Sequence, residues 1–250
     1  MRVTLSTRRP EVKVRPAKRG RMITVIIPTL NSENGLAACL TALITPTVEG
    51  IVREVIVVDG GSSDRTGEII DQAGATLVRS SAGRGRQLAA GADQARMPWL
   101  LFLHPDTILE AGWEREATTF MERVDSGARP AAAAAFRFAV DEPGLGSRLT
   151  EVGVAARCAL LRMPYGNQGL LIPRRLYRQL GGYKALSLME DVDFMRRIGR
   201  RRTAMLRARA ISNTERARHG GNLRNGLRHL SCLALHHLRV PSGMIARLYR

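Results

Sequence analysis

Residues 22–33 read MITVIIPTLNSE, and residues 55–69 read VIVVDGGSSDRTGEI. In each stretch a run of apolar, largely β-branched residues ends in a polar group, which is the pattern of a buried strand followed by a loop. If the two strands are neighbours in a parallel sheet, both loops lie beyond one edge, where open α/β sheets bind ligands. The polar side chains expected at that edge are Asn31, Glu33, Asp59, Ser62 and Asp64.

The segments around these stretches alternate between strand and helix. Strands are expected at 22–27, 55–58, 75–79 and 99–103, and helices at 35–44, 64–73 and 84–96. One apolar stripe along the first helix is formed by Leu36, Leu40, Leu43 and Ile44. Such alternation predicts parallel strands joined by crossover helices. We therefore expect an α/β fold, Rossmann-like, with three α/β/α layers and a mostly parallel central sheet.

The pattern is less regular after residue 103. A helical stretch is expected up to about residue 124, and the alanine run 131–135 is ambiguous between helix and strand until FRFAV at 136–140 favours strand. PRRLYRQLGG at 173–182 has proline near its start and glycine at its end, which predicts a short helix. Another helix is expected from Glu190, a strand at 203–211, and one or two helices beyond it.

Charge is unevenly distributed along the chain, whose formal net charge is +17. Residues 1–21 contain eight basic residues and one acid, and residues 196–250 contain fourteen and one. We expect residues 1–21 to form a basic flexible arm and 22–250 a single domain with a basic helical C-terminal segment at about 219–250. That segment is either a helix packed on the domain with a solvated arginine face or a helix lying on an anionic membrane surface.

Composition limits the class of protein. Aromatic residues make up only 4% and no recognisable nucleic-acid module is present, so a nucleic-acid partner is not expected. The three cysteines are widely separated and form no CxxC motif, which suggests neither a disulfide framework nor a zinc site. No secretory or membrane-spanning apolar run is recognisable. We expect a cytoplasmic protein, with the inner face of the membrane as a second location that the basic tail would allow.

Three separated acidic positions carry the chemistry that the residues alone suggest. Asp59, Asp106 and the pair Glu190–Asp191 each follow a strand or begin a helix, so all could face one cleft. If the strand continues to residue 106, alternation could put His104 and Asp106 on the same side, and an imidazole with a carboxylate suits Mn²⁺, or Mg²⁺ where phosphates also bind. Glu190 or Asp191 could act as a general base. Simple capping of a turn or helix explains each acid equally well.

Four motifs together resemble the family 2 inverting glycosyltransferases, which have the GT-A fold. ITVIIPTLNSE from Ile23 and VVDGGSSDRT from Val57 resemble the family's first two strands with their loops. LHPDT from Leu103 resembles its degenerate DxD metal element, and GGY from Gly181 followed by EDVD from Glu190 resembles its acceptor-side region. HPDT, YGNQG at 165–169 and the closing residues 221–249 further resemble a small bacterial single-domain subgroup associated with selenium or radical-SAM gene neighbourhoods.

The resemblance implies a role for each motif in a hexosyltransferase-like enzyme. Glu33 and Asp59 would contact the nucleoside of a nucleoside-diphosphate sugar. Asp106, with His104, would bind Mn²⁺ or Mg²⁺ bridging the donor diphosphate. Asp191, beside Glu190, would remove the proton of an unknown acceptor as it displaces the diphosphate with inversion. The other residues expected to bind the nucleotide sugar are Pro28, Gly61, Arg84, Arg86, Gln168 and Arg216.

Two departures from the family pattern leave the substrate open. His104 stands where the first Asp of the DxD element would be, and Asn167 stands where the subgroup commonly has Asp. Basic side chains from two loops could hold the diphosphate once the later loop closes: Arg84, Arg86, Arg216, Arg218 and His219. For any one of these arginines, an ordinary solvated charge is the alternative explanation.

Other classes of protein fit the sequence less well. A dinucleotide-binding oxidoreductase needs a GxGxxG turn after its first strand, and a nucleotidyltransferase needs a basic glycine-rich loop there, but PTLNSE follows that strand. The remaining alternative is a catalytically inactive transferase fold that acts as a basic module binding a membrane or nucleic acid.

Overall fold

The computed structural model describes residues 21–141, 148, 151–154, 164, 166–186 and 189–212. Residues 1–20 of the predicted arm at 1–21, the C-terminal segment at 219–250 and the predicted site residue Arg216 lie outside the described residues, as do Arg218 and His219; Arg21 is described and pairs with Glu122. None of the helices in the described part of the chain has the length and apolar character needed to span a bilayer.

The centre of the fold is one sheet with the strand order β3-β2-β1-β4-β7-β6-β8-β5. Its strands are β1 (Ile23–Thr29), β2 (Val52–Asp59), β3 (Thr76–Arg79), β4 (Trp99–Phe102), β5 (Thr107–Leu109), β6 (Ala133–Val140), β7 (Leu170–Pro173) and β8 (Thr203–Ser212). Neighbours β1–β2, β1–β4, β2–β3 and β6–β8 are parallel, whereas β4–β7, β6–β7 and β5–β8 are antiparallel. The sheet is therefore mostly parallel, as predicted.

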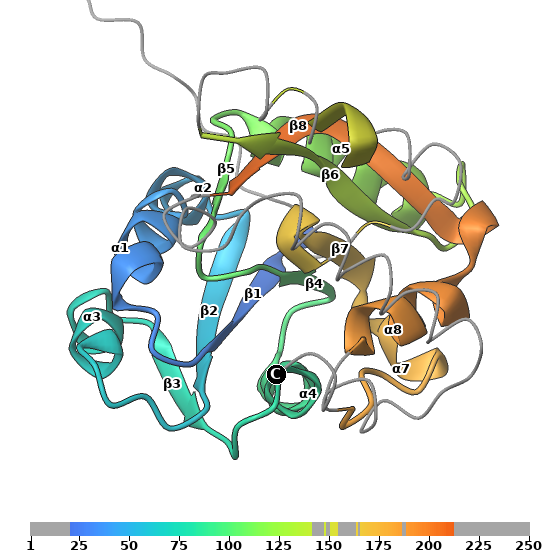
Figure 1. Ribbon diagram of the computed structural model, residues 1–250. Helices are drawn as coiled ribbons and strands as arrows, with labels where there is room; N and C mark the ends of the chain where they lie inside the picture. Colours follow the sequence, from blue (N-terminus) through green and yellow to red (C-terminus); the bar gives the residue numbers. More distant parts are fainter. Residues whose placement is uncertain are drawn as a thin grey trace, which may run out of the picture.

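Helices cover both faces of this sheet. They are α1 (Glu33–Thr41), α2 (Ile44–Val48), α3 (Thr66–Gln72), α4 (Arg84–Gln94), α5 (Trp113–Asp125), α7 (Arg174–Gln179) and α8 (Glu190–Ile198), with the 3-10 turns η2 (Gly166–Gln168) and η3 (Arg200–Arg202). One apolar core joins the sheet to α1, α3 and α5, and a second joins it to α4, α7 and α8. Figure 1 shows α1 and α3 on one side of the sheet and α7 with α8 on the other. The predicted three α/β/α layers are confirmed.

Most predicted elements are present, and three details of the prediction were wrong. The helix expected at 35–44 ends at Thr41, and Ile44 begins the separate helix α2 with 59% of its surface exposed. The apolar stripe therefore stops at Leu43. Pro173 is the last residue of β7 and precedes the helix rather than forming its first turn. The short strands β5 and β7 were not predicted, because three- and four-residue apolar runs carry little periodicity.

Close packing of α4 on the sheet depends on a glycine. A Cβ atom on Gly91 would lie 2.5 Å from a methyl carbon of Ile26 in β1 and 2.9 Å from one of Val58 in β2. Because real Cβ atoms do not approach so closely, any other residue would push α4 away from these strands. This contact brings the first turn of α4 to the carboxyl edge of the sheet.

Candidate active site

The loops after β1 and β2 are bound to each other at the carboxyl edge. The backbone N–H of Asn31 donates to Ser62 Oγ at 2.9 Å, and the backbone N–H of Ser63 donates back to Asn31 Oδ1 at 2.9 Å. The same exchange links the next residues: Glu33 N–H donates to Asp64 Oδ2 at 3.1 Å, and Arg65 N–H donates to Glu33 Oε2 at 3.0 Å. The two motifs that open the sequence therefore form one structural unit.

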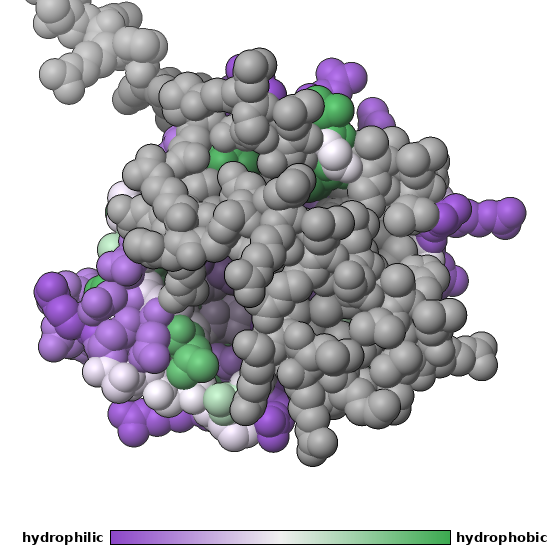
Figure 2. All heavy atoms as spheres, viewed as in Figure 1, coloured by the Kyte–Doolittle hydropathy of each residue, from purple (hydrophilic) through white to green (hydrophobic). Residues whose placement is uncertain are grey.

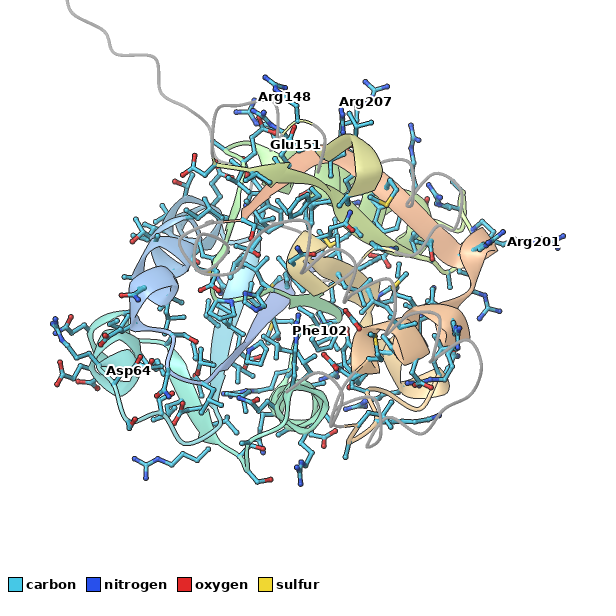
Figure 3. The ribbon with its side chains drawn as sticks, in the orientation of Figure 1. Asp64, Phe102, Arg148, Glu151, Arg201 and Arg207 are labelled. Atoms are coloured by element: carbon cyan, nitrogen blue, oxygen red, sulfur yellow. The ribbon has the colours of Figure 1, made fainter. Side chains whose placement is uncertain are left out.

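Asp64 lies in the loop after β2, two residues before the start of α3. Partial burial of its carboxyl group is outweighed by hydrogen bonds from Thr66 and from the backbone of Glu33, which hold the pKa of Asp64 below its usual value. Figure 3 places Asp64 beside α3, on the flank where Figure 2 shows hydrophilic side chains gathered. Asp64 thus stabilises the loop pair from its outer side.

Asp59 ends β2 and organises its own turn. Its carboxylate accepts hydrogen bonds from the backbone N–H of Gly61 at 3.2 Å and from Ser62 at 3.1 Å. Gly61 adopts φ +98°, a conformation that strongly favours glycine, and a Cβ there would meet nothing within 4 Å. The turn is therefore open to solvent beside Asp59.

His104 and Asp106 follow β4, the strand beside β1, so they lie at the same edge. The backbone N–H of Asp106 donates to His104 Nδ1 at 3.2 Å, and Nδ1 lies 3.5 Å from Asp106 Oδ2. A Cβ on Gly35, in the first turn of α1, would lie only 2.3 Å from Asp106 Oδ1, so the glycine makes room for this carboxylate. Beneath it, burial and the charge of Asp106 raise the pKa of the Cys39 thiol to about 12.

The residues after β4 fit a divalent cation that is shared with a phosphate ligand. No group of three or more His, Cys, Asp or Glu side chains suitable for a metal occurs in the described ranges. One carboxylate with substrate phosphates is a usual way to hold Mg²⁺. While His104 Nδ1 accepts the Asp106 N–H, a neutral ring carries its proton on Nε2, so His104 would ligate a metal only after giving up that hydrogen bond.

A second cluster joins the starts of α4 and α8. Arg84 Nε lies 3.3 Å from Glu190 Oε1. This contact is an ion pair without hydrogen-bond geometry, and the buried Nε atom makes no hydrogen bond. Burial raises the pKa of Glu190; Arg84 counteracts this shift and Asp191 adds to it. Tyr183 lies in the same cluster: its full burial, with the charge of Asp191, raises the pKa of its hydroxyl well above the usual value.

Gly85 allows this cluster to form. A Cβ on Gly85 would lie 2.2 Å from the carbonyl oxygen of Lys184 and 3.3 Å from the Cβ of Glu190. The segment that leads into α8 therefore packs directly against the first turn of α4. Met189, just before α8, adopts φ +64°, which is uncommon for a residue with a side chain.

Arg197 holds the GGY segment against α8. Its guanidinium donates to the carbonyl oxygens of Leu180 and Gly182 at 2.5 and 2.6 Å, and to Asp193 Oδ2 at 2.6 and 2.9 Å. Burial alone would raise the pKa of Asp193, but the bonds from Arg197 and Lys184 lower it. The third acid of EDVD is thus a partner of Arg197, and Glu190 and Asp191 remain at the helix start.

The other predicted site residues differ in exposure. Pro28 is buried within β1, whereas Arg86 is exposed and donates to the carbonyl oxygen of Ala82 at 2.9 Å. Gln168 is buried, with 1% of its surface exposed, and its amide nitrogen donates to the carbonyl oxygen of Phe136 at 3.1 Å. That bond attaches η2 to β6, and Asn167 in the same turn accepts a hydrogen bond from Thr107 Oγ1 through its carbonyl oxygen.

Sequence reasoning missed Gln87. This residue connects the first half of the site, the loop pair after β1 and β2, to α4, whose start forms the second half together with the start of α8. This buried residue of α4 donates to carbonyl oxygens at the ends of β1 and β2. The signal available was a glutamine on the apolar face of a predicted helix, where a polar side chain needs an internal partner.

Comparison with known proteins identifies this architecture. The crystal structure of Staphylococcus aureus TarS residues 1–349 superposes with a TM-score of 0.58 at 18% identity, covering 77% of this chain and 60% of that one. Mycobacterium tuberculosis glucosyl-3-phosphoglycerate synthase, in complex with Mn²⁺ and UDP-glucose, superposes with a TM-score of 0.56 at 21% identity, covering 89% and 80%. The fold is GT-A. The curled, mostly parallel sheet with β6 and β8 set at an angle to β1 and β2 (Figure 1) is its GT-A core.

The sequence of this GT-A chain matches a family model over the part that contains the loop pair, Asp106 and the start of α4, and the match ends before α8. Residues 24–139 match Glycosyl transferase family 2. Glycosyltransferase AglJ of Haloferax volcanii is 32% identical over 133 residues, 52% of this chain and 41% of that protein. A glucosyl-3-phosphoglycerate synthase of Mycolicibacterium paratuberculosis is 42% identical over 62 residues, 25% of this chain and 18% of that protein. The chain thus aligns with less than half the length of either relative.

Proposed function

We propose that this protein is a family 2 glycosyltransferase that moves a sugar from a nucleoside-diphosphate sugar to an acceptor hydroxyl, with inversion and with help from Mn²⁺ or Mg²⁺. The observation that carries the proposal is the match of residues 24–139 to the family, in a chain whose acidic motif residues end β2, follow β4 and begin α8. Relatives support the donor class, because M. tuberculosis glucosyl-3-phosphoglycerate synthase forms a complex with Mn²⁺ and UDP-glucose.

The proposed roles of the donor-side residues follow from their places in the fold. The loop pair that contains Glu33 and Asp59 receives the nucleoside, with the open turn at Gly61 beside it. Arg84 and Arg86, at the start of α4, offer positive charge to the diphosphate. A cation bound by Asp106 would neutralise charge that develops on the leaving diphosphate.

On the acceptor side, Asp191 removes the proton of the attacking hydroxyl. This carboxylate belongs to the first turn of α8, where the helix dipole favours negative charge. Glu190 is buried beside it and paired with Arg84, so it sets the charge around the base. Proton removal in step with attack on the anomeric carbon gives a single displacement with inversion.

Thermal-shift screening of UDP, GDP, dTDP and their sugars, with and without Mn²⁺, tests the donor class. A rise in unfolding temperature with one nucleotide identifies the base, and a larger rise with Mn²⁺ supports metal use. If no nucleotide raises the unfolding temperature, the proposal fails, and binding to anionic vesicles or nucleic acid would then support the inactive basic module.

Asp191→Asn tests the base. A general base contributes on the order of 10²- to 10⁴-fold, so kcat for release of nucleoside diphosphate from the identified donor should fall by about that factor. Nucleotide affinity, measured by calorimetry, should stay near that of the parent. Asp71→Asn, an exposed acid of α3, is the control for loss of one charge. Turnover by the Asp191 variant at near parental rate would show that another group is the base.

The protein's organisation and location are part of the same proposal. We infer a single catalytic domain from residue 22 onward, preceded by a basic arm, and a cytoplasmic enzyme whose basic C-terminal segment could contact an anionic membrane surface.

A further inference from the structure

Gln87 makes two hydrogen bonds to the ends of the strands that lead into the candidate nucleoside loops. Its amide nitrogen donates to the carbonyl oxygen of Thr29 at 2.7 Å and to that of Val58 at 2.9 Å. Thr29 is the last residue of β1, and Val58 is the residue before the end of β2. Only 4% of the Gln87 surface is exposed. A single side chain therefore ties two neighbouring strand ends to α4.

The packing around Gln87 leaves little freedom for another arrangement. A Cβ on Gly60, directly after β2, would lie 3.0 Å from Gln87 Nε2. Gly60 in turn donates its N–H to the Thr29 carbonyl oxygen at 2.9 Å, so the first residue of the second loop shares an acceptor with the glutamine. The position of α4 thereby determines where both loops begin.

Gln87 also lies one helical turn after Arg84. Residues three apart in a helix share a face, so Gln87 and Arg84 are held at one spacing by the backbone of α4. Arg84 pairs with Glu190 at the start of α8, beside Asp191. The chain of contacts runs from the strand ends through Gln87 and Arg84 to the acidic pair.

We propose that Gln87 is a positioning residue that sets the register between the nucleoside loops and Arg84, and so determines how tightly a nucleoside diphosphate spans the two halves of the site. This inference rests on the proposed function. It assigns to Gln87 no contact with substrate: Gln87 acts through the backbone of Thr29 and Val58 and through the first turn of α4.

Three substitutions test the proposal. Gln87→Met keeps the length and removes the donor, Gln87→Glu replaces the donor with an acceptor facing two carbonyl oxygens, and Gln87→Asn keeps the amide but shortens its reach. Gln94→Met is the control, because Gln94 is exposed on the same helix. Affinity for the nucleoside diphosphate found by screening is measured by calorimetry well below each unfolding temperature, with circular dichroism as the test of folding.

We expect the Kd to rise about tenfold or more in the folded Gln87 variants and to stay within about twofold of the parent in Gln94→Met. A purely structural glutamine would lower the unfolding temperature and leave the Kd unchanged, which would overturn the inference while the proposed function stands. If none of the three variants folds, Gln87 is a folding residue and the inference is also overturned. A parent protein that binds no nucleoside diphosphate would overturn the proposed function and this inference together.

Discussion

The three acids of the EDVD motif look alike in the sequence but differ in burial and in their partners in the structure. Glu190 is 5% exposed and has Arg84 as its ion-pair partner. The EDVD motif alone does not separate its three acids, since all of them fit a helix start. In the structure one is buried beside Arg84, one lies next to it, and Asp193 is bound by Arg197. The roles of the three acids therefore differ because their partners come from other parts of the fold, which the local sequence pattern does not show.

The raised pKa of Glu190 predicts a pH dependence of stability. The folded protein binds this proton more readily than the unfolded chain, so the group stabilises the fold at pH values below its ordinary pKa, and that stabilisation is lost as pH rises through the folded value. Glu190→Gln removes the titration. We expect the unfolding temperature of the parent to fall relative to this variant as pH is raised from about 4 towards 7.

Thermal unfolding of both proteins across that pH range is the measurement. Glu68→Gln, at an exposed position of α3, controls for the loss of one negative charge. A parent that gains stability relative to Glu190→Gln as pH rises would contradict the expectation, because it would mean that the pair with Arg84 outweighs burial.

At the scale of elements, short helices in this fold depend on side chains that bind distant backbone. The helix α8 has nine residues, too few to be stable alone, and it is attached to the GGY segment through Arg197. The aromatic rings of Tyr177, Tyr183 and Phe194 pack between α7 and α8, with centroids 4.6–6.0 Å apart. This attachment keeps the start of α8 in place beside α4.

Arg197→Ala should destabilise the protein by roughly 3 kcal/mol, because it leaves the carbonyl oxygens of Leu180 and Gly182 without a charged donor and the Asp193 carboxylate with Lys184 alone. Arg196→Ala changes the neighbouring exposed arginine and should alter the free energy of unfolding by less than about 0.5 kcal/mol. Urea denaturation of the two variants measures the difference. Equal effects would show that the bonds of Arg197 contribute nothing beyond its charge.

The elements themselves were largely predictable, and the exceptions have physical reasons. Periodic helices and long apolar strands carry their signal within a few turns, which explains why β1, β2, α4 and α5 were recognised. The exposed Ile44 departs from its stripe because the chain turns at Ala42 and Leu43 and a new helix begins. Strand β7 is only four residues long and gains its place by pairing with β4 and β6.

For the whole molecule, the uneven charge predicts which part of the chain is dispensable for folding. Deleting residues 2–20 removes seven basic residues and one acid and lowers the net charge from +17 to +11. A segment with so much like charge and so little apolar surface contributes little to a core. We expect the unfolding temperature to stay within about 2 °C of the parent, and retention on a cation exchanger to decrease. A large fall in unfolding temperature would show that the arm packs on the domain.

Each strand, helix, polar loop and motif has its signal within about a dozen consecutive residues, so the alternation of elements, the polar loops at the carboxyl edge and the order of the four motifs can be predicted from the sequence. The role of α4 in joining the loop pair to the start of α8 is visible only in the folded protein. Gln87 reaches strand ends 29 and 58 residues earlier in the chain, and Arg84 meets Glu190 from another element altogether. These partners meet because α4 packs closely, at Gly85 and Gly91, against residues that are far away in the sequence. No local sequence pattern predicts which residues those are.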